Sequence, residues 1–181
     1  LLDTDIEENG KDDGNNWKRR TTKYLYSKRL RDNDQIKFHQ AYILGIGEAF
    51  LLDKLGVKAD FYHFNESHSG FAIIGLIKDL MKKTGLSFEQ AAVVMYYKSL
   101  FTIHTPIPAG NWEFSKAEPA YAFNSKLLSK EEHEKLVTLG DKNGVLNMAQ
   151  LLLNLCGFKN GVSEEHGSVS REQWGGYAIG E

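Results

Sequence analysis

This chain of 181 residues has little cysteine and little proline, and it has no long run of apolar residues. Its single cysteine, Cys156, excludes an internal disulfide framework and favours a reducing compartment, so we expect a cytoplasmic protein. No apolar run reaches the ~20 residues that a membrane-spanning helix needs, and we recognise no signal peptide. The formal net charge of −2 gives no general attraction for nucleic acid or for anionic membranes.

What the sequence does contain fits one globular domain or a large part of one. Apolar residues make up 41% of the chain, which is enough for a sizeable core. The chain lacks an initiating methionine, its first five residues resemble the end of a strand, and it stops without a tail at Glu181. We therefore expect a segment of a longer protein.

The sequence divides into a polar segment, residues 1–34, and an α/β segment, residues 35–181. Acidic residues crowd positions 3–13, and basic residues crowd Lys18 to Arg31. A solvated loop is the simpler interpretation of this charge pattern, and contact with phosphate, an acidic partner or a second subunit is the alternative.

A long helix is expected from a cap at Asp32 or Asn33 to about Leu55, with Gly56 as its stop. Its apolar spacing predicts that it is largely buried, through Ile36, Ile43, Leu44, Phe50, Leu51 and Leu55. Gly45 and Gly47 lie inside this helical pattern and not after a strand. They therefore indicate close helix packing and not a phosphate-binding loop.

Three short strands are expected, at residues 59–63, 100–104 and 157–162. Helices are expected between and after them, at residues 69–84, 87–98 and 147–156, with Gly85 as the stop of the first. Another helix is expected to begin at residue 129, and a final helical segment is expected to end near Trp174. Ser87 with Gln90 and Ser129 with Glu132 form the capping-box pattern. Strands that alternate with helices predict an α/β fold with a parallel sheet.

The first two predicted strands end in a histidine, His63 and His104, and His166 follows the third. Ligands of open α/β sheets bind beyond the carboxyl ends of the strands, and those ends share one edge. We therefore expect the three histidines at one edge of the sheet. Two prolines in the stretch HTPIPAG, residues 104–110, make the turn after the second strand rigid, which suits a preorganised site.

The cluster His63, Asn65, Glu66 and His68 allows several chemistries. Two imidazoles and a carboxylate could bind a metal, but the histidines are five residues apart and straddle a strand-to-helix turn. Glu66 with His68 could form a general acid/base pair. The structural alternative is that Asn65 or Ser67 caps the next helix and His68 satisfies backbone groups.

These residues resemble motifs of the α-glucan (glycogen, starch, maltodextrin) phosphorylase family, in particular its bacterial and archaeal branch. HFNESH is similar to H-x-N-E-G-H, and HTPIPAG is similar to H-T-P-V-P-A-G. NGVSEEHGSVSREQW resembles N-G-V-S-x-L-H-G-x-V-S-R-x-M-W, and LLDTDI and YILGIG also match in order. The resemblance spans nearly the whole chain and is identified with the later part of the family's N-terminal domain.

The resemblance implies a two-domain glycosyltransferase of the B type, with the active site between Rossmann-like halves. It implies phosphorolysis of terminal α-1,4-linked glucose, with α-1,4-glucan, inorganic phosphate and glucose 1-phosphate as partners, and a homo-oligomer is compatible with it. By this resemblance Asn65, Glu66, His68 and Thr105 bind substrate, and His104 contacts the reacting sugar as the catalytic residue.

The family's cofactor is pyridoxal phosphate, bound to a lysine of the other domain, and no lysine here has the context of that residue. The segment alone is therefore expected to be inactive and to hold neither cofactor nor metal. Two alternatives stay open: another B-type glycosyltransferase that uses a sugar nucleotide, and a free-standing carbohydrate-binding or regulatory module. The reading frame on either side of residues 1 and 181 separates them.

Overall fold

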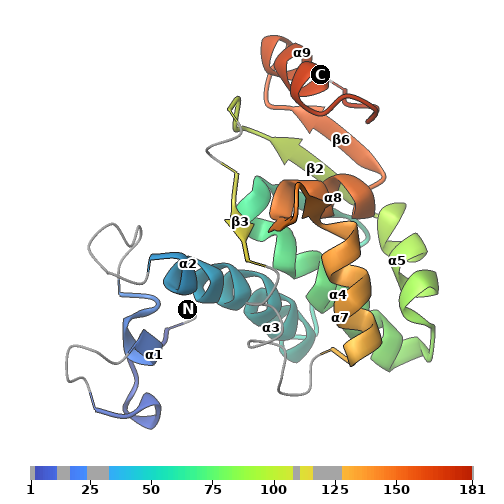
Figure 1. The fold of residues 1–181 in the computed structure, drawn as a ribbon. Coiled ribbons are helices and arrows are strands. Elements are labelled where there is room, and N and C mark those ends of the chain that lie inside the picture. The colour runs from blue at the N-terminus through green and yellow to red at the C-terminus, as the bar shows by residue number, and fades with distance from the viewer. Residues whose placement is uncertain (1–2, 12–16, 24–32, 108–110, 116–127, 181) are drawn as a thin grey trace.

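The computed structural model describes residues 3–11, 17–23, 33–107, 111–115 and 128–180. At its centre is a parallel sheet of three strands in the order β1-β2-β6 (Figure 1). The strands are β1 (Tyr62–Asn65), β2 (Ser99–Ile103) and β6 (Phe158–Gly161). In register, His63 lies opposite Leu100, which in turn lies opposite Phe158. The predicted α/β class with a parallel sheet is confirmed.

The helices follow the predicted order closely. They are α1 (Trp17–Arg20), α2 (Asn33–Tyr42), α3 (Glu48–Lys54), α4 (Gly70–Thr84), α5 (Phe88–Tyr96), α7 (Lys130–Leu139), α8 (Met148–Leu155) and α9 (Glu164–Gln173). Short turns η1 (Glu7–Asn9), η2 (Ile43–Gly47) and η3 (Ser67–Ser69) complete the set. Both capping boxes are confirmed at the starts of α5 and α7. Gly85 ends α4 in the left-handed conformation, as expected.

The core lies on one face of the parallel sheet. Side chains alternate along a strand, so Phe64, Phe101 and Ile103 share a face, and all three are buried. The interior apolar residues of α4 and α8 complete this core, among them Phe71, Ile73, Ile74, Ile77, Met148, Leu151 and Leu152. Burial of each such side chain stabilises the fold by about 1.5–3 kcal/mol. The opposite face carries the exposed residues His63, Asn65 and Phe158.

The long helix expected up to Leu55 is interrupted by a π-helical turn, η2, between α2 and α3. One extra residue in a turn rotates the residues that follow by about 100°. Phe50 and Leu55, which follow η2, are 60% and 67% exposed, and Leu44 within η2 is exposed as well. Their predicted burial was wrong. The cap expected at Asp32 lies outside the described residues.

The packing role expected of Gly45 is confirmed. It lies against α4, and a Cβ placed on it would come 2.4 Å from the backbone nitrogen of Ala72. No side chain fits in that space. The π-helical turn therefore brings the backbone of η2 directly against the first turn of α4.

The first strand begins and ends later than predicted. It covers Tyr62–Asn65, because Phe64 is the side chain that enters the core and Asn65 still pairs with Thr102. His63 therefore lies inside the strand and not at its end. The second and third strands match their predicted ranges to within one residue at each end.

A second sheet was not predicted. It is antiparallel, in the order β3-β5-β4, from β3 (Glu113–Phe114), β4 (Asp141–Lys142) and β5 (Val145–Asn147). The turn between β4 and β5 is Asn143-Gly144, with φ of 55° and 87°. An Asn-Gly pair is a strong hairpin signal, so this hairpin was readable from the sequence. Residues 116–127 lie outside the described part.

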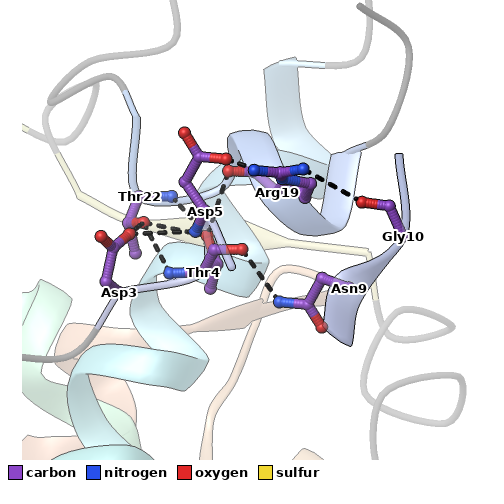
Figure 2. A network of polar contacts seen from close by, with 7 residues as sticks. All are labelled: Asp3, Thr4, Asp5, Asn9, Gly10, Arg19 and Thr22. Carbon is purple, nitrogen blue, oxygen red and sulfur yellow. Dashed lines mark hydrogen bonds and ion pairs between the residues drawn. The ribbon is translucent and has the colours of Figure 1, made fainter. Parts of the chain in front are cut away.

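The N-terminal residues make a local polar network (Figure 2). Arg19 Nε lies 2.7 Å from Asp5 Oδ1, and its Nη1 donates to the carbonyl of Gly10. The backbone nitrogen of Thr4 donates to Thr22 Oγ1 at 2.9 Å. One base of the predicted basic stretch is thus neutralised within the chain. The proposed boundary at residue 34 stays a prediction.

No strand is assigned at residues 3–5, and the first two residues lie outside the described part. Figure 1 shows α1 beside α2 and away from the parallel sheet. The side chain of Gln40 in α2 donates to the carbonyl of Thr21, which joins the two segments. In the described residues, no helix has the length and apolar character required to cross a membrane.

Candidate functional site

The carboxyl ends of β1 and β2 meet at Glu66. Its backbone nitrogen donates to the carbonyl of Thr102 at 3.1 Å, which continues the pairing of the two strands by one residue. Its carbonyl accepts hydrogen bonds from the backbone and the hydroxyl of Ser69. The chain therefore turns sharply here and enters η3 and then α4.

The carboxylate of Glu66 accepts three hydrogen bonds from the protein. Oε1 accepts from the backbone nitrogen of Ser67 at 2.7 Å. Oε2 accepts from the backbone nitrogen of His104 at 3.0 Å and from Thr105 Oγ1 at 2.7 Å. One carboxylate thus joins the end of β1 to the turn after β2.

The backbone of Glu66 has φ 72° and ψ 164°. This region is essentially restricted to glycine, and a side chain held there costs about 1–3 kcal/mol. The surrounding hydrogen bonds must offset that cost, and strained residues of this kind cluster at functional sites.

His68 lies in η3, half-buried, with its ring centroid 6.1 Å from that of Trp112. Burial lowers the pKa of His68; the carboxylate of Glu66 opposes this effect, and His104 reinforces it. A neutral imidazole is therefore favoured, and a neutral imidazole can both donate and accept a hydrogen bond.

The structure brings most of the predicted site residues together. Glu66, His104 and Thr105 are in direct contact, and His68 is within electrostatic reach of the first two. Asn65, the last residue of β1, is exposed, as is His104. The substrate-binding and catalytic roles of these five residues stay predictions. Residues 108–110 of the second motif lie outside the described part.

The three histidines do not share one edge as predicted. His104 follows β2 directly, and His166 lies in the first turn of α9, after β6. His63 lies inside β1, where its Nε2 is 2.7 Å from Thr102 Oγ1. The expectation was wrong for His63, because the strand continues for two residues beyond it.

Thr102 and Asn160 were missed by sequence reasoning. Thr102 Oγ1 donates to Asn160 Oδ1 at 2.7 Å, so the same hydroxyl accepts from His63 Nε2. These contacts cross all three strands on the face opposite the core. Polar residues at alternate positions of apolar strands were the available signal.

The loop after β6 is built on a close approach of two backbones. A Cβ on Gly161 would lie 2.3 Å from the nitrogen of Gly167 in α9. Val162 N donates to the carbonyl of Ile103, which fixes this loop against the end of β2. His166 Nε2 is buried and has no hydrogen-bond partner among the described residues. Ser163 caps α9 through the backbone nitrogen of His166.

Across the described ranges, no group of three His, Cys, Asp or Glu residues is placed to hold a metal ion. Two lysines have lowered pKa through burial, Lys142 and Lys159. Their ammonium groups lie over the rings of Trp174 and Tyr96, so each already has a partner within the chain. These lysines do not fit pyridoxal phosphate.

No known protein-family profile matches the chain. It is similar to a maltodextrin phosphorylase of Thermococcus litoralis, with 35% identity over 174 residues. It is also similar to glycogen phosphorylases of Aquifex aeolicus, with 32% identity over 180 residues, and of Mycobacterium tuberculosis, with 33% over 195 residues. These matches cover 96%, 96% and 98% of this chain but only 20%, 24% and 22% of the relatives.

The described residues form an α/β segment with a three-stranded parallel sheet. Over nearly its whole length the chain is similar to one segment of the glycogen and maltodextrin phosphorylases. It spans about a fifth to a quarter of the length of the curated relatives that it matches.

Proposed function

We propose that this chain forms one wall of the glucosyl site of an α-glucan phosphorylase. The whole protein would transfer a terminal α-1,4-linked glucose to inorganic phosphate and release glucose 1-phosphate. The observation that carries the proposal is the Glu66 carboxylate, which joins the ends of two parallel strands beside the exposed His104. Ligands of such sheets bind at this edge.

The residues of this edge suit recognition of a sugar. Asn65 and His104 are exposed polar side chains that can donate and accept hydrogen bonds, as sugar hydroxyls do. His68 is favoured in its neutral form, which can do the same. The contact with His104 would accelerate the reaction if it strengthens as positive charge develops on the sugar ring.

Several components of the proposed reaction lie outside these residues. Pyridoxal phosphate, when bound, would supply a phosphate group for proton transfer, and its lysine is proposed for another part of the protein. A cytoplasmic location and a homo-oligomer are proposed for the whole protein. The 181 residues alone are expected to be inactive, because they offer sugar contacts without the cofactor or a phosphate site.

The test compares two proteins: the 181-residue chain and the natural protein that contains it. Each is incubated with maltodextrin and phosphate, and glucose 1-phosphate is measured with and without pyridoxal phosphate. We expect phosphate-dependent release by the natural protein and none by the isolated chain. Release by the isolated chain would overturn the proposal that these residues form only one wall of the site.

The other outcomes of this comparison identify the alternatives. No release by the natural protein would reject the proposed function. Affinity for a nucleoside diphosphate sugar would then indicate a sugar-nucleotide transferase. Maltooligosaccharide binding without turnover, by a protein that ends near residue 181, would indicate a binding module.

A further inference from the structure

We propose that Glu66 is a positioning residue of this site: its carboxylate holds the backbone of His104 and the hydroxyl of Thr105 in place, and does not itself bind the sugar. The inference rests on the proposed function, because it concerns what the site presents to a sugar. It changes the role that the sequence motif predicts for Glu66, from substrate contact to support of the residue that makes the contact.

Most acceptor positions of the Glu66 carboxylate are already occupied by the protein. A carboxylate has about four acceptor positions, two on each oxygen. Both positions on Oε2 are taken, by His104 N and Thr105 Oγ1. One position on Oε1 is taken by Ser67 N. A sugar hydroxyl that competed for Oε2 would have to break a contact that orders the turn after β2.

The backbone conformation of Glu66 is one that glycine adopts more easily. The structure describes two non-glycine residues with positive φ, Glu66 and Asn143. Asn143 lies in a hairpin turn beside Gly144, where asparagine is common. Glu66 has no such local explanation. A glycine would adopt φ 72° without strain, so the benefit of glutamate at this position lies in its side chain.

The carboxylate of Glu66 fixes the backbone at His104. The peptide between Ile103 and His104 is held on both sides: the carbonyl of Ile103 accepts from Val162 N, and the nitrogen of His104 donates to Glu66. The ring of His104 stays exposed. Glu66 therefore sets the position of the backbone from which an exposed histidine extends, and its effect on a sugar passes through His104.

Two substitutions test this role. Glu66→Gln keeps the shape but replaces one acceptor oxygen with a donor group. Glu66→Gly removes the carboxylate and also relieves the positive φ, so the fold is expected to survive even if Glu66→Gln destabilises it. Glu134→Gln on α7 is the matched control, because its side chain is 65% exposed and its ion pair with Lys130 is long at 3.9 Å.

The first measurement is amide NMR and hydrogen exchange on the 181-residue chain. An amide that donates to a carboxylate resonates downfield and exchanges slowly. In both Glu66 variants we expect the signals of Ser67 and His104 to move upfield, and exchange at His104 to accelerate about tenfold or more. The Glu134 variant should leave both amides unchanged. An unchanged His104 amide in Glu66→Gly would overturn the inference.

The second measurement is phosphorolysis by the natural protein. Glu66→Gly should lower kcat by about tenfold or more at an unfolding midpoint close to the parent's, with a smaller change in KM for maltodextrin. A raised KM with unchanged kcat would make Glu66 a sugar ligand and overturn the inference. If the parent shows no phosphorolysis, the proposed function fails while the NMR result still reports on the support of His104.

Discussion

Thr102 in the middle strand donates a hydrogen bond to Asn160 in β6, with 2.7 Å between the two oxygens. The same hydroxyl accepts a hydrogen bond from His63 in β1. Thr102 is buried although it faces away from the core. Its hydroxyl thus connects the three strands of the parallel sheet on the face that carries the most polar side chains.

Replacement of this hydroxyl by a methyl group should destabilise the sheet. Thr102→Val keeps the shape and removes the hydrogen-bond partner of the exposed His63 and the half-buried Asn160, so we expect a loss of about 0.5–1.5 kcal/mol in the free energy of unfolding. Thr102→Ser keeps the hydroxyl, so its free energy of unfolding should fall by less than half of that loss. Urea unfolding measures both, and equal losses would show that the methyl group matters more than the hydrogen bonds.

The contact of η2 with α4 predicts a severe effect of one added carbon. Gly45→Ala would place a Cβ 2.4 Å from Ala72 N, a backbone atom that cannot move without the helix. We expect a loss of about 1–3 kcal/mol or more on thermal or urea unfolding. Gly175→Ala is the control, because no atom lies within 4 Å of its added Cβ. Similar stability of the two variants would contradict this packing.

Several features of the fold could be predicted from the sequence because they depend on local chemistry. Capping boxes at Ser87 and Ser129, the stop at Gly85 and the apolar strand ending at Ile103 all follow from short patterns. The π-helical turn was not readable, because it depends on the fit of Gly45 against Ala72, which is distant in sequence.

Part of the candidate site could also be predicted from the sequence, because its motifs are short local patterns. Glu66, His104 and Thr105 could be placed at the ends of their strands from the sequence, whereas Asn65 was expected beyond the first strand and is its last residue. The positive φ of Glu66 and its bond to His104 N could not, because both arise when two strand ends meet. The position of His63 was wrong because Phe64 extends the strand into the core.

Cys156 should be unreactive in the folded protein. It is fully buried, and burial raises the pKa of its thiol to about 12, so almost no thiolate forms at neutral pH. A thiol reagent should therefore modify it only as fast as the chain unfolds. Addition of urea should accelerate the reaction in step with loss of structure. Rapid modification under native conditions would contradict the burial.

His68 should make stability depend on pH in a defined direction. Its pKa is lowered in the folded state below the ordinary value of 6.5, chiefly by burial, so the unfolded chain binds more protons in that range. This contribution is fully present above the ordinary value and is lost as the pH falls toward the lowered one. Urea unfolding at pH 7.5 and 5.5 should show a smaller difference for His68→Gln than for the parent. An equal difference would exclude this contribution.

The central claim is that the edge around His104 contacts a reacting sugar, and the most direct measurement is phosphorolysis of maltodextrin by the natural protein carrying His104→Ala. Loss of one hydrogen bond to a charged group, about 1.5 kcal/mol, corresponds to roughly tenfold in rate. The account predicts a fall in kcat/KM of that size or larger, with an unchanged unfolding midpoint. Lys130→Ala is the control, because its side chain is 92% exposed on α7. A loss at His104→Ala no larger than that of the control would contradict the account.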